Sequence, residues 1–123
     1  MKLHLSQAAG RNLVTAYGPG YVSVNHQRYE HSLIIMPEEL DAEWAPASFA
    51  ELQPEHLLPL IDRNLQVVII GTGPTLRFPR PEILRPLMQA HVGFEVMDVQ
   101  AACRTYNILV DEDRRVAAAL LMA

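Results

Sequence analysis

The sequence predicts an α/β domain in which helices pack on a sheet. Three observations lead to this prediction: β-type runs fill the first third, two solidly apolar runs follow, and strand patterns then alternate with helical patterns. The chain has 123 residues, an ordinary size for one domain, and neither an internal repeat nor a linker-like stretch divides it. We therefore expect a single domain over residues 1–123.

The first third is typical of short β-strands joined by turns. Residues 13–17 and 21–25 are rich in β-branched and aromatic side chains, and Gly18-Pro19-Gly20 between them is a turn signal. A third run starts at Arg28, alternates at first and ends in the apolar stretch Leu33–Met36. This pattern predicts a strand that begins in a peripheral hairpin and continues into a central sheet.

Residues 37–54 predict an irregular acidic segment, with Trp44 as its buried anchor. Pro54 suits the first turn of a helix that extends to about Arg63. The apolar residues of this segment recur at helical spacing: Leu57, Leu58 and Ile61.

Residues 66–70 are the clearest buried strand, and Gly71-Thr72-Gly73-Pro74 ends it. A helix follows within residues 81–91. Because an interior proline removes a backbone donor, we expect the regular part of this helix to begin near Arg85, with Pro86 in its first turn.

The last part of the chain predicts strand, helix and strand. Residues 94–97 form a short strand, Asp98 is a suitable N-cap for a helix over 99–110, and 116–122 is a final apolar strand. The apolar face of the helix holds Val99, Ala102, Cys103, Tyr106 and Leu109 or Val110. Its opposite face holds Gln100, Arg104, Asn107 and Asp111.

Composition limits the classes of function. The net charge of −4 and the pI of about 5.7 argue against general nucleic-acid binding, which needs a basic face. A single cysteine excludes an internal disulfide and a thiolate cluster, and the five histidines form no H-x-x-x-H pair. No secretory signal is visible, and the longest apolar runs are far shorter than the roughly 20 residues that span a bilayer. We expect a cytoplasmic protein with neither metal nor cofactor.

Gly71-Thr72-Gly73 is the sharpest local feature of the sequence. Open α/β sheets bind ligands at such strand ends, where free backbone N–H groups can hold an anion. The dinucleotide pattern is incomplete, because Leu76 stands where a third glycine is needed and Pro74 has no N–H. We therefore favour a tight turn with a positive φ over a nucleotide site.

A group of arginines follows this turn, with Glu82 as the only offsetting charge: Arg77, Arg80 and Arg85. Together with Arg104 they are either a solvated basic face or the lining of a site for an anion or an acidic partner. We expect Asn107 to bond to loop backbone near the glycine turn. Cys103, alone on an apolar helix face, predicts an inert core residue.

The order of these features resembles a known family. The segments that carry the resemblance are Ser32-Leu33-Ile34, Trp44, Val68-Ile69-Ile70-Gly71-Thr72-Gly73, Glu95-Val96-Met97-Asp98 with Ala101 or Ala102, Arg104-Thr105-Tyr106-Asn107, Glu112, Arg115-Val116 and Ala117-Ala118-Ala119-Leu120. From about Tyr21 onward the chain resembles a small single-domain family of unknown function. That family includes a mitochondrial assembly factor of respiratory complex I and adipogenesis-associated vertebrate proteins.

The resemblance implies a three-layer fold with a central mixed sheet, helices packed on it and an additional N-terminal β layer. It implies no established enzyme activity and no cofactor. For the mitochondrial relatives it implies work through protein contacts during assembly of a membrane complex. The chain lacks an Arg-rich, Ser-rich leader and so resembles a bacterial or otherwise cytosolic member.

We expect a non-catalytic protein-interaction domain with protein partners, which assists assembly of a respiratory or other membrane complex. It would reach a membrane only peripherally, through a partner. The alternatives are a small-molecule or anion-binding protein, with or without enzyme activity, and an oligomeric scaffold. The candidate binding residues are Gly71, Thr72, Gly73, Arg77, Arg80, Arg104 and Asn107. They form one site only if the glycine bend emerges at the sheet edge beside the arginine-bearing side of the 99–110 helix.

Overall fold

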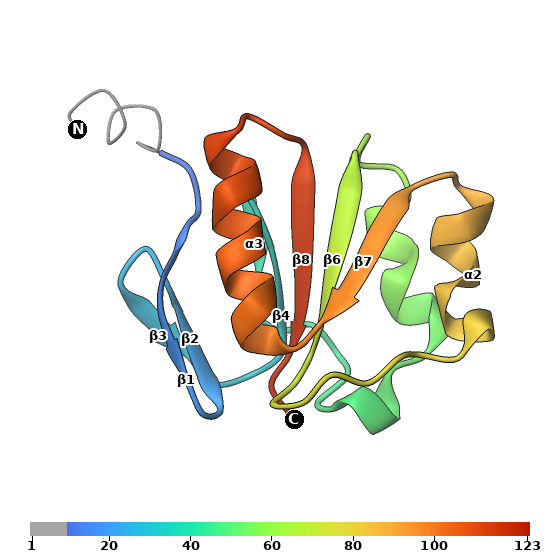
Figure 1. Cartoon of the computed structure of the whole chain (residues 1–123), viewed down its shortest axis with the longest axis horizontal. Coiled ribbons are helices and arrows are strands. Elements are labelled where there is room, and N and C mark those ends of the chain that lie inside the picture. The colour runs from blue at the N-terminus through green and yellow to red at the C-terminus, as the bar shows by residue number, and fades with distance from the viewer. Residues whose placement is uncertain (1–9) are drawn as a thin grey trace.

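The computed structural model describes residues 10–123, which form two β-sheets with helices packed around the larger one (Figure 1). The N-terminal sheet is an antiparallel meander of three strands: β1 (Val14–Gly18), β2 (Tyr21–Val24) and β3 (Gln27–Tyr29). The central sheet has five strands in the order β5-β4-β8-β6-β7. Its strands are β4 (Leu33–Met36), β5 (Glu39–Asp41), β6 (Val67–Thr72), β7 (Gly93–Met97) and β8 (Val116–Leu121).

The central sheet is mixed. β6 runs parallel to both of its neighbours, whereas β4 runs antiparallel to β8 and to β5. The register places Val67 beside Val116 and Gly71 beside Leu120. The carboxyl ends of β6 and β8 therefore lie at the same end of the sheet, and the start of β4 lies there too, because Leu33 also pairs with Leu120.

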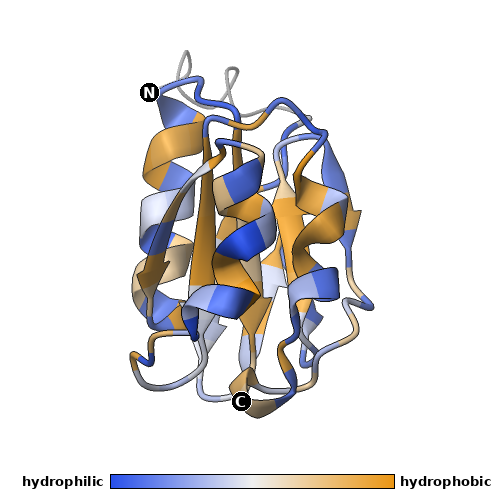
Figure 2. Ribbon diagram, turned by 90° about the vertical axis from the view of Figure 1, so that its right-hand side faces the viewer, coloured by the Kyte–Doolittle hydropathy of each residue, from blue (hydrophilic) through white to orange (hydrophobic). Residues whose placement is uncertain are grey.

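Alternate residues of the central strands point into two separate hydrophobic cores, one on each face of the sheet. Val67, Ile69 and Leu120 point toward α3 (Val99–Asp111) and the N-terminal sheet. Val68, Ile70 and the other residues of opposite parity point toward α2 (Pro81–Gln89) and the 3₁₀ helix η2 (Pro54–Leu60). Figure 2 shows the hydrophobic strands enclosed between helices. The predicted three-layer arrangement, with a central mixed sheet and an additional N-terminal β layer, is confirmed.

The run from residue 28 to 36 is two strands rather than one. Its first part pairs in the N-terminal sheet as β3 and its last part pairs in the central sheet as β4. The expected passage from hairpin to central sheet is therefore correct. The break falls at residues 30–32, where the chain crosses between the two sheets. Residues 37–54, predicted to be irregular, contain β5 and a short 3₁₀ helix, η1 (Phe49–Glu51).

Two helical predictions need correction. The segment after Pro54 is the 3₁₀ helix η2 and ends at Leu60 rather than Arg63, with Pro59 in its interior lacking the N–H that α-helical bonding requires. The next helix begins at Pro81, not near Arg85, and continues through Pro86. Pro86 deprives the Glu82 carbonyl of its usual partner, but Glu82 is exposed, so water can replace the missing donor.

Trp44 anchors the acidic segment, as predicted. Its ring is buried among residues of the α2-side core, and its Nε1 donates a hydrogen bond to the His56 carbonyl at 3.0 Å. This bond ties the segment after β5 to η2. Within residues 10–123, no helix has the length and apolar character needed to cross a membrane.

Candidate protein-interaction surface

The Gly-Thr-Gly turn at the end of β6 is packed into the protein, and all three of its residues are buried. A Cβ atom on Gly71 would lie 3.1 Å from the Ala102 Cβ and 3.3 Å from the Val99 Cα, so glycine lets α3 approach β6 closely. Gly73 has a φ of +87°, which confirms the predicted positive-φ turn. The expected emergence of the bend as an exposed feature is wrong, because α3 covers Gly71 and the chain end at Ala123 covers Gly73.

The Thr72 side chain holds the loop that follows the turn. Its buried hydroxyl donates to the Thr75 carbonyl at 2.7 Å and accepts from the Arg77 N–H at 3.1 Å. One side chain at the end of β6 thus bonds to backbone groups three and five residues further on. Residues 74–80, which we name the 74–80 loop, leave the sheet on a fixed path.

The nearby helix start does not offer free donors of the kind that bind phosphates in dinucleotide folds. The Val99 N–H donates to the Gly73 carbonyl at 2.9 Å, and the Asp98 carboxylate accepts from the Ala101 N–H at 2.9 Å. Asp98 is therefore the predicted N-cap of α3. Two of the first-turn N–H groups are used within the chain, and a carboxylate lies where an anion would have to approach.

The predicted binding arginines divide between two regions. The Arg77 guanidinium lies over the Phe49 ring of η1, 4.9 Å from its centroid, and Arg80 is the exposed N-cap of α2. Arg104, on α3, instead donates to the Tyr17 hydroxyl of β1 at 3.0 Å. That hydrogen bond raises the pKa of the exposed Arg104 guanidinium, so the side chain keeps its charge.

Asn107 does not reach the glycine turn, and this expectation was wrong. Its amide group binds both backbone groups of Val14, donating to the carbonyl at 2.7 Å and accepting from the N–H at 3.0 Å. Asn107 therefore takes the place of a neighbouring strand for one residue of β1. Ligand binding by the remaining candidates stays a prediction.

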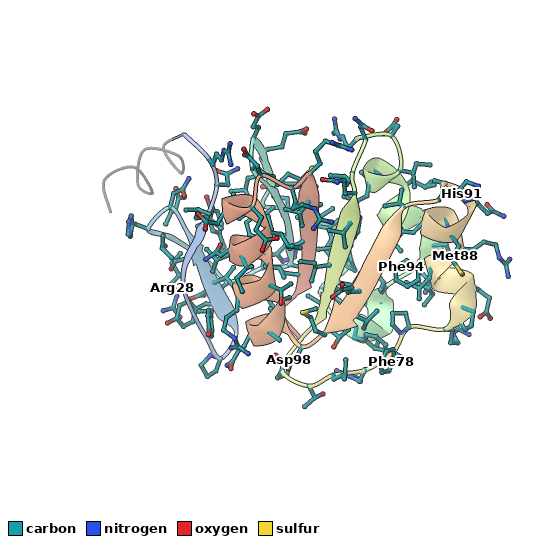
Figure 3. The ribbon with its side chains drawn as sticks, turned by 45° about the horizontal axis from the view of Figure 1, so that its top comes forward. Arg28, Phe78, Met88, His91, Phe94 and Asp98 are labelled. Carbon is teal, nitrogen blue, oxygen red and sulfur yellow. The ribbon has the colours of Figure 1, made fainter. Side chains whose placement is uncertain are left out.

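Large apolar side chains are exposed on the 74–80 loop. Leu76 is 50% exposed and Phe78 is 72% exposed, and the exposed Arg77 lies between them in the sequence. Figure 3 shows Phe78 on the loop below β7, away from Met88 at the far end of α2. Aromatic residues and arginine are enriched at protein contacts, so the exposed Phe78 beside Arg77 makes this loop a candidate contact surface.

Sequence reasoning identified Arg77 and Arg80 but missed Leu76 and Phe78. The available signal was the segment Leu76-Arg77-Phe78, in which two apolar residues flank an arginine between the prolines Pro74 and Pro79. Pro79 is buried, so its neighbours on either side point outward. Without a known loop path, the same letters are equally compatible with a strand whose apolar side is buried.

The loop and the start of α2 are positive in an otherwise negative protein. Residues 74–85 contain three arginines and one glutamate, a net charge of +2, whereas the whole chain carries −4. The rest of the chain therefore carries −6. The local field favours partners with acidic groups around an apolar centre.

Cys103 is a core residue. It is buried on the α3 side of the sheet, and burial raises the pKa of its thiol to about 12. The thiol is therefore protonated at neutral pH and is a poor nucleophile. In the part of the chain that the structure describes, no three His, Cys, Asp or Glu residues are grouped so that they could hold a metal ion.

Residues 14–121 match the family model described as "Protein of unknown function (DUF498/DUF598)". The chain is 30% identical over 104 residues to a Bos taurus protein named "NADH dehydrogenase [ubiquinone] 1 alpha subcomplex assembly factor 3". That match covers 83% of this chain and 55% of the bovine protein, so the chain spans about half the length of this relative.

Solved structures have the same fold. A crystal structure of a Bordetella parapertussis protein is 42% identical with a TM-score of 0.86, covering 94% of this chain and 99% of the other. A solution structure of a Bordetella pertussis protein described as a Mth938-like domain is 35% identical with a TM-score of 0.77. It covers 92% of this chain and 87% of the other. The predicted resemblance to a family that includes a complex I assembly factor is confirmed.

Proposed function

Because the chain belongs to the DUF498/DUF598 family, we propose that it is a non-catalytic protein-interaction domain that assists assembly of a respiratory membrane complex. It contacts its protein partner through the 74–80 loop. The bovine relative is named as an assembly factor of NADH dehydrogenase, and 83% of this chain aligns with it. An assembly factor works through contact surfaces, so an exposed apolar surface on a fixed loop is the feature this role requires.

The exposure of Phe78 is the observation that carries this proposal. A phenylalanine that a partner covers fully contributes more than most contact residues, because aromatic anchors dominate the energetics of interfaces. Leu76 adds apolar area beside it, and Arg77 and Arg80 add charged hydrogen-bond donors. The domain works in the cytoplasm and reaches the membrane only through this partner.

A complementation experiment tests the role. The gene is deleted in its native host, and the amount of assembled NADH dehydrogenase complex is measured on native gels. Deletion lowers that amount and the wild-type gene restores it. The double variant Leu76→Ser, Phe78→Ser fails to restore it, although its circular dichroism and unfolding midpoint match those of the wild type, because both side chains project into solvent.

Ile108→Ser is the matched control. Ile108 is 57% exposed on α3, an apolar side chain of similar exposure on the opposite side of the central sheet. This variant restores assembly fully. An unchanged amount of assembled complex in the deletion strain would refute the assembly role. Full restoration by the double variant would refute the loop as the contact surface.

A further inference from the structure

A second site lies at the opposite end of the central sheet from the glycine turn. An open pocket of about 350 Å³ forms where β6 and β8 begin and β4 ends, with Leu65, Val116 and Met36 in its lining. This is the upper end of the molecule in Figure 1. Its volume lies at the lower limit of pockets that hold small organic molecules.

The pocket is rich in arginine. Four of the nine arginines of the chain line it: Arg11, Arg63, Arg114 and Arg115. They come from three segments that the fold brings together, namely the chain before β1, the turn after η2, and the connection from α3 to β8. Three carboxylates also line it, Glu38, Glu39 and Asp113, so the lining has a net charge of +1.

Two of these arginines are held by ion pairs. Arg11 pairs with Asp113 at 2.6 Å and donates to the Val110 carbonyl at 3.2 Å, while Arg63 pairs with Glu39 at 3.2 Å. These pairs neutralise two of the three carboxylates and shape the walls of the pocket. They leave the other two arginines without a carboxylate partner among the described residues.

The donors of Arg114 and Arg115 remain available. Arg115 is oriented by its Nε, which donates to the Asn64 carbonyl at 2.6 Å, and its terminal nitrogens have no partner within residues 10–123. The Arg114 guanidinium has neither a hydrogen bond nor an ion pair in the same part of the chain. Guanidinium groups bind carboxylates through paired N–H donors, and one that is already oriented loses less entropy on binding.

We propose that this pocket binds a small organic anion. Arg114 and Arg115 hold its carboxylate, and a short aliphatic part lies against Met36, Leu65 and Val116. Glu38 is the one lining carboxylate without an ion pair among the described residues, so it opposes the ligand charge and weakens binding.

Titration of the ¹⁵N-labelled full chain with hexanoate tests this inference. Saturable shifts are expected for the backbone amides of Asn64, Arg114 and Arg115, with no shifts in the 74–80 loop. Arg114→Ala weakens hexanoate binding at least tenfold, whereas Arg85→Ala, which removes an exposed arginine outside the pocket, leaves it unchanged. Glu38→Gln tightens binding severalfold.

A titration with inorganic phosphate decides the class of ligand. Inorganic phosphate binds at least tenfold more weakly than hexanoate, because it has no aliphatic part to cover the apolar lining. Equal binding of the two would refute an organic anion as the ligand. Weaker hexanoate binding by Glu38→Gln, or no effect of Arg114→Ala, would refute the assigned arrangement. None of these outcomes depends on a protein partner.

Discussion

Thr72 decides the path of the candidate loop through one hydroxyl group. The group is fully buried, donates to the Thr75 carbonyl and accepts from the Arg77 N–H. Thr72→Val keeps the shape of the side chain but leaves both backbone groups without this partner. We expect it to lower the free energy of unfolding by about 1–3 kcal/mol, measured by urea denaturation.

The matched variant is Thr72→Ser, which keeps the hydroxyl and loses only a methyl group. It should retain most of the stability and the protection of the Arg77 amide from hydrogen exchange. Equal losses for the valine and serine variants would show that packing around Thr72, and not its hydrogen bonds, holds the 74–80 loop.

Cys103 leads to a pH prediction at the same scale. Burial raises the pKa of its thiol from 9.0 to about 12, so its thiolate fraction at pH 8 is roughly 1,000-fold lower than in an exposed cysteine. Iodoacetamide should label the folded protein far more slowly than the urea-unfolded protein, as followed by mass spectrometry. Rapid labelling of the folded protein would contradict the inert assignment.

The raised pKa of Cys103 also makes the stability of the protein depend on pH. The folded protein holds the thiol proton more tightly than the unfolded chain does, so this contribution to stability is complete below pH 9. It is lost as the pH rises from about 9 toward 12. Burial also raises the pKa of Tyr106, which adds to the alkaline loss.

At the scale of elements, side chains of α3 fasten the N-terminal β layer. Asn107 binds both backbone groups of Val14, and the Tyr106 hydroxyl donates to the Asn12 carbonyl at 2.9 Å. The Tyr106 hydroxyl, carried on the apolar face of α3, thus has a polar partner. Among the strands of residues 10–123, β1 pairs only with β2, so Asn107 satisfies the Val14 groups on the other side of β1.

Asn107→Ala therefore weakens the docking of the β layer. We expect a loss of about 1–3 kcal/mol in stability and faster hydrogen exchange of the Val14 amide, because both backbone groups lose their partner. Arg104→Ala is the control on the same helix, since it removes one exposed hydrogen bond to Tyr17 and should change stability little. A smaller loss for Asn107→Ala than for Arg104→Ala would contradict this account.

Sequence patterns predicted the type of most elements but not their ends. Asp98 marked the start of α3 correctly, because an N-cap acts within one turn of its own helix. Prolines account for the errors in the helical segments: Pro86 was expected in the first turn of its helix but lies inside α2, and Pro59, inside η2, lacks an N–H that an α-helix needs. Whether a helix tolerates a proline depends on whether water reaches the carbonyl left unpaired, which only the three-dimensional structure shows.

At the scale of the whole molecule, the burial of the central strands explains the layered architecture. Val67–Thr72 and Val116–Leu121 are buried along their full length, which requires cover on both faces, and the predicted sheet with helices follows from that requirement. The arginine-lined pocket did not follow, because its lining comes from residues as distant in sequence as Arg11, Arg63 and Arg114. The spacing of residues along the sequence does not indicate that residues this far apart line one pocket.

The predicted single binding site is replaced by two separate features at opposite ends of the sheet. The 74–80 loop lies beyond the carboxyl end of β6, and the pocket lies where β6 begins. Arg104 and Asn107 belong to neither, since both serve the packing of β1 on α3.

Photo-crosslinking is the most direct test of contact through the 74–80 loop. A photoreactive phenylalanine analogue replaces Phe78 in one variant and Ile108 in another, and both are illuminated in cells of the native host. We predict that position 78 crosslinks to a subunit of the respiratory complex and that position 108 does not. Crosslinks to such a subunit from position 108, with none from position 78, would contradict the assignment.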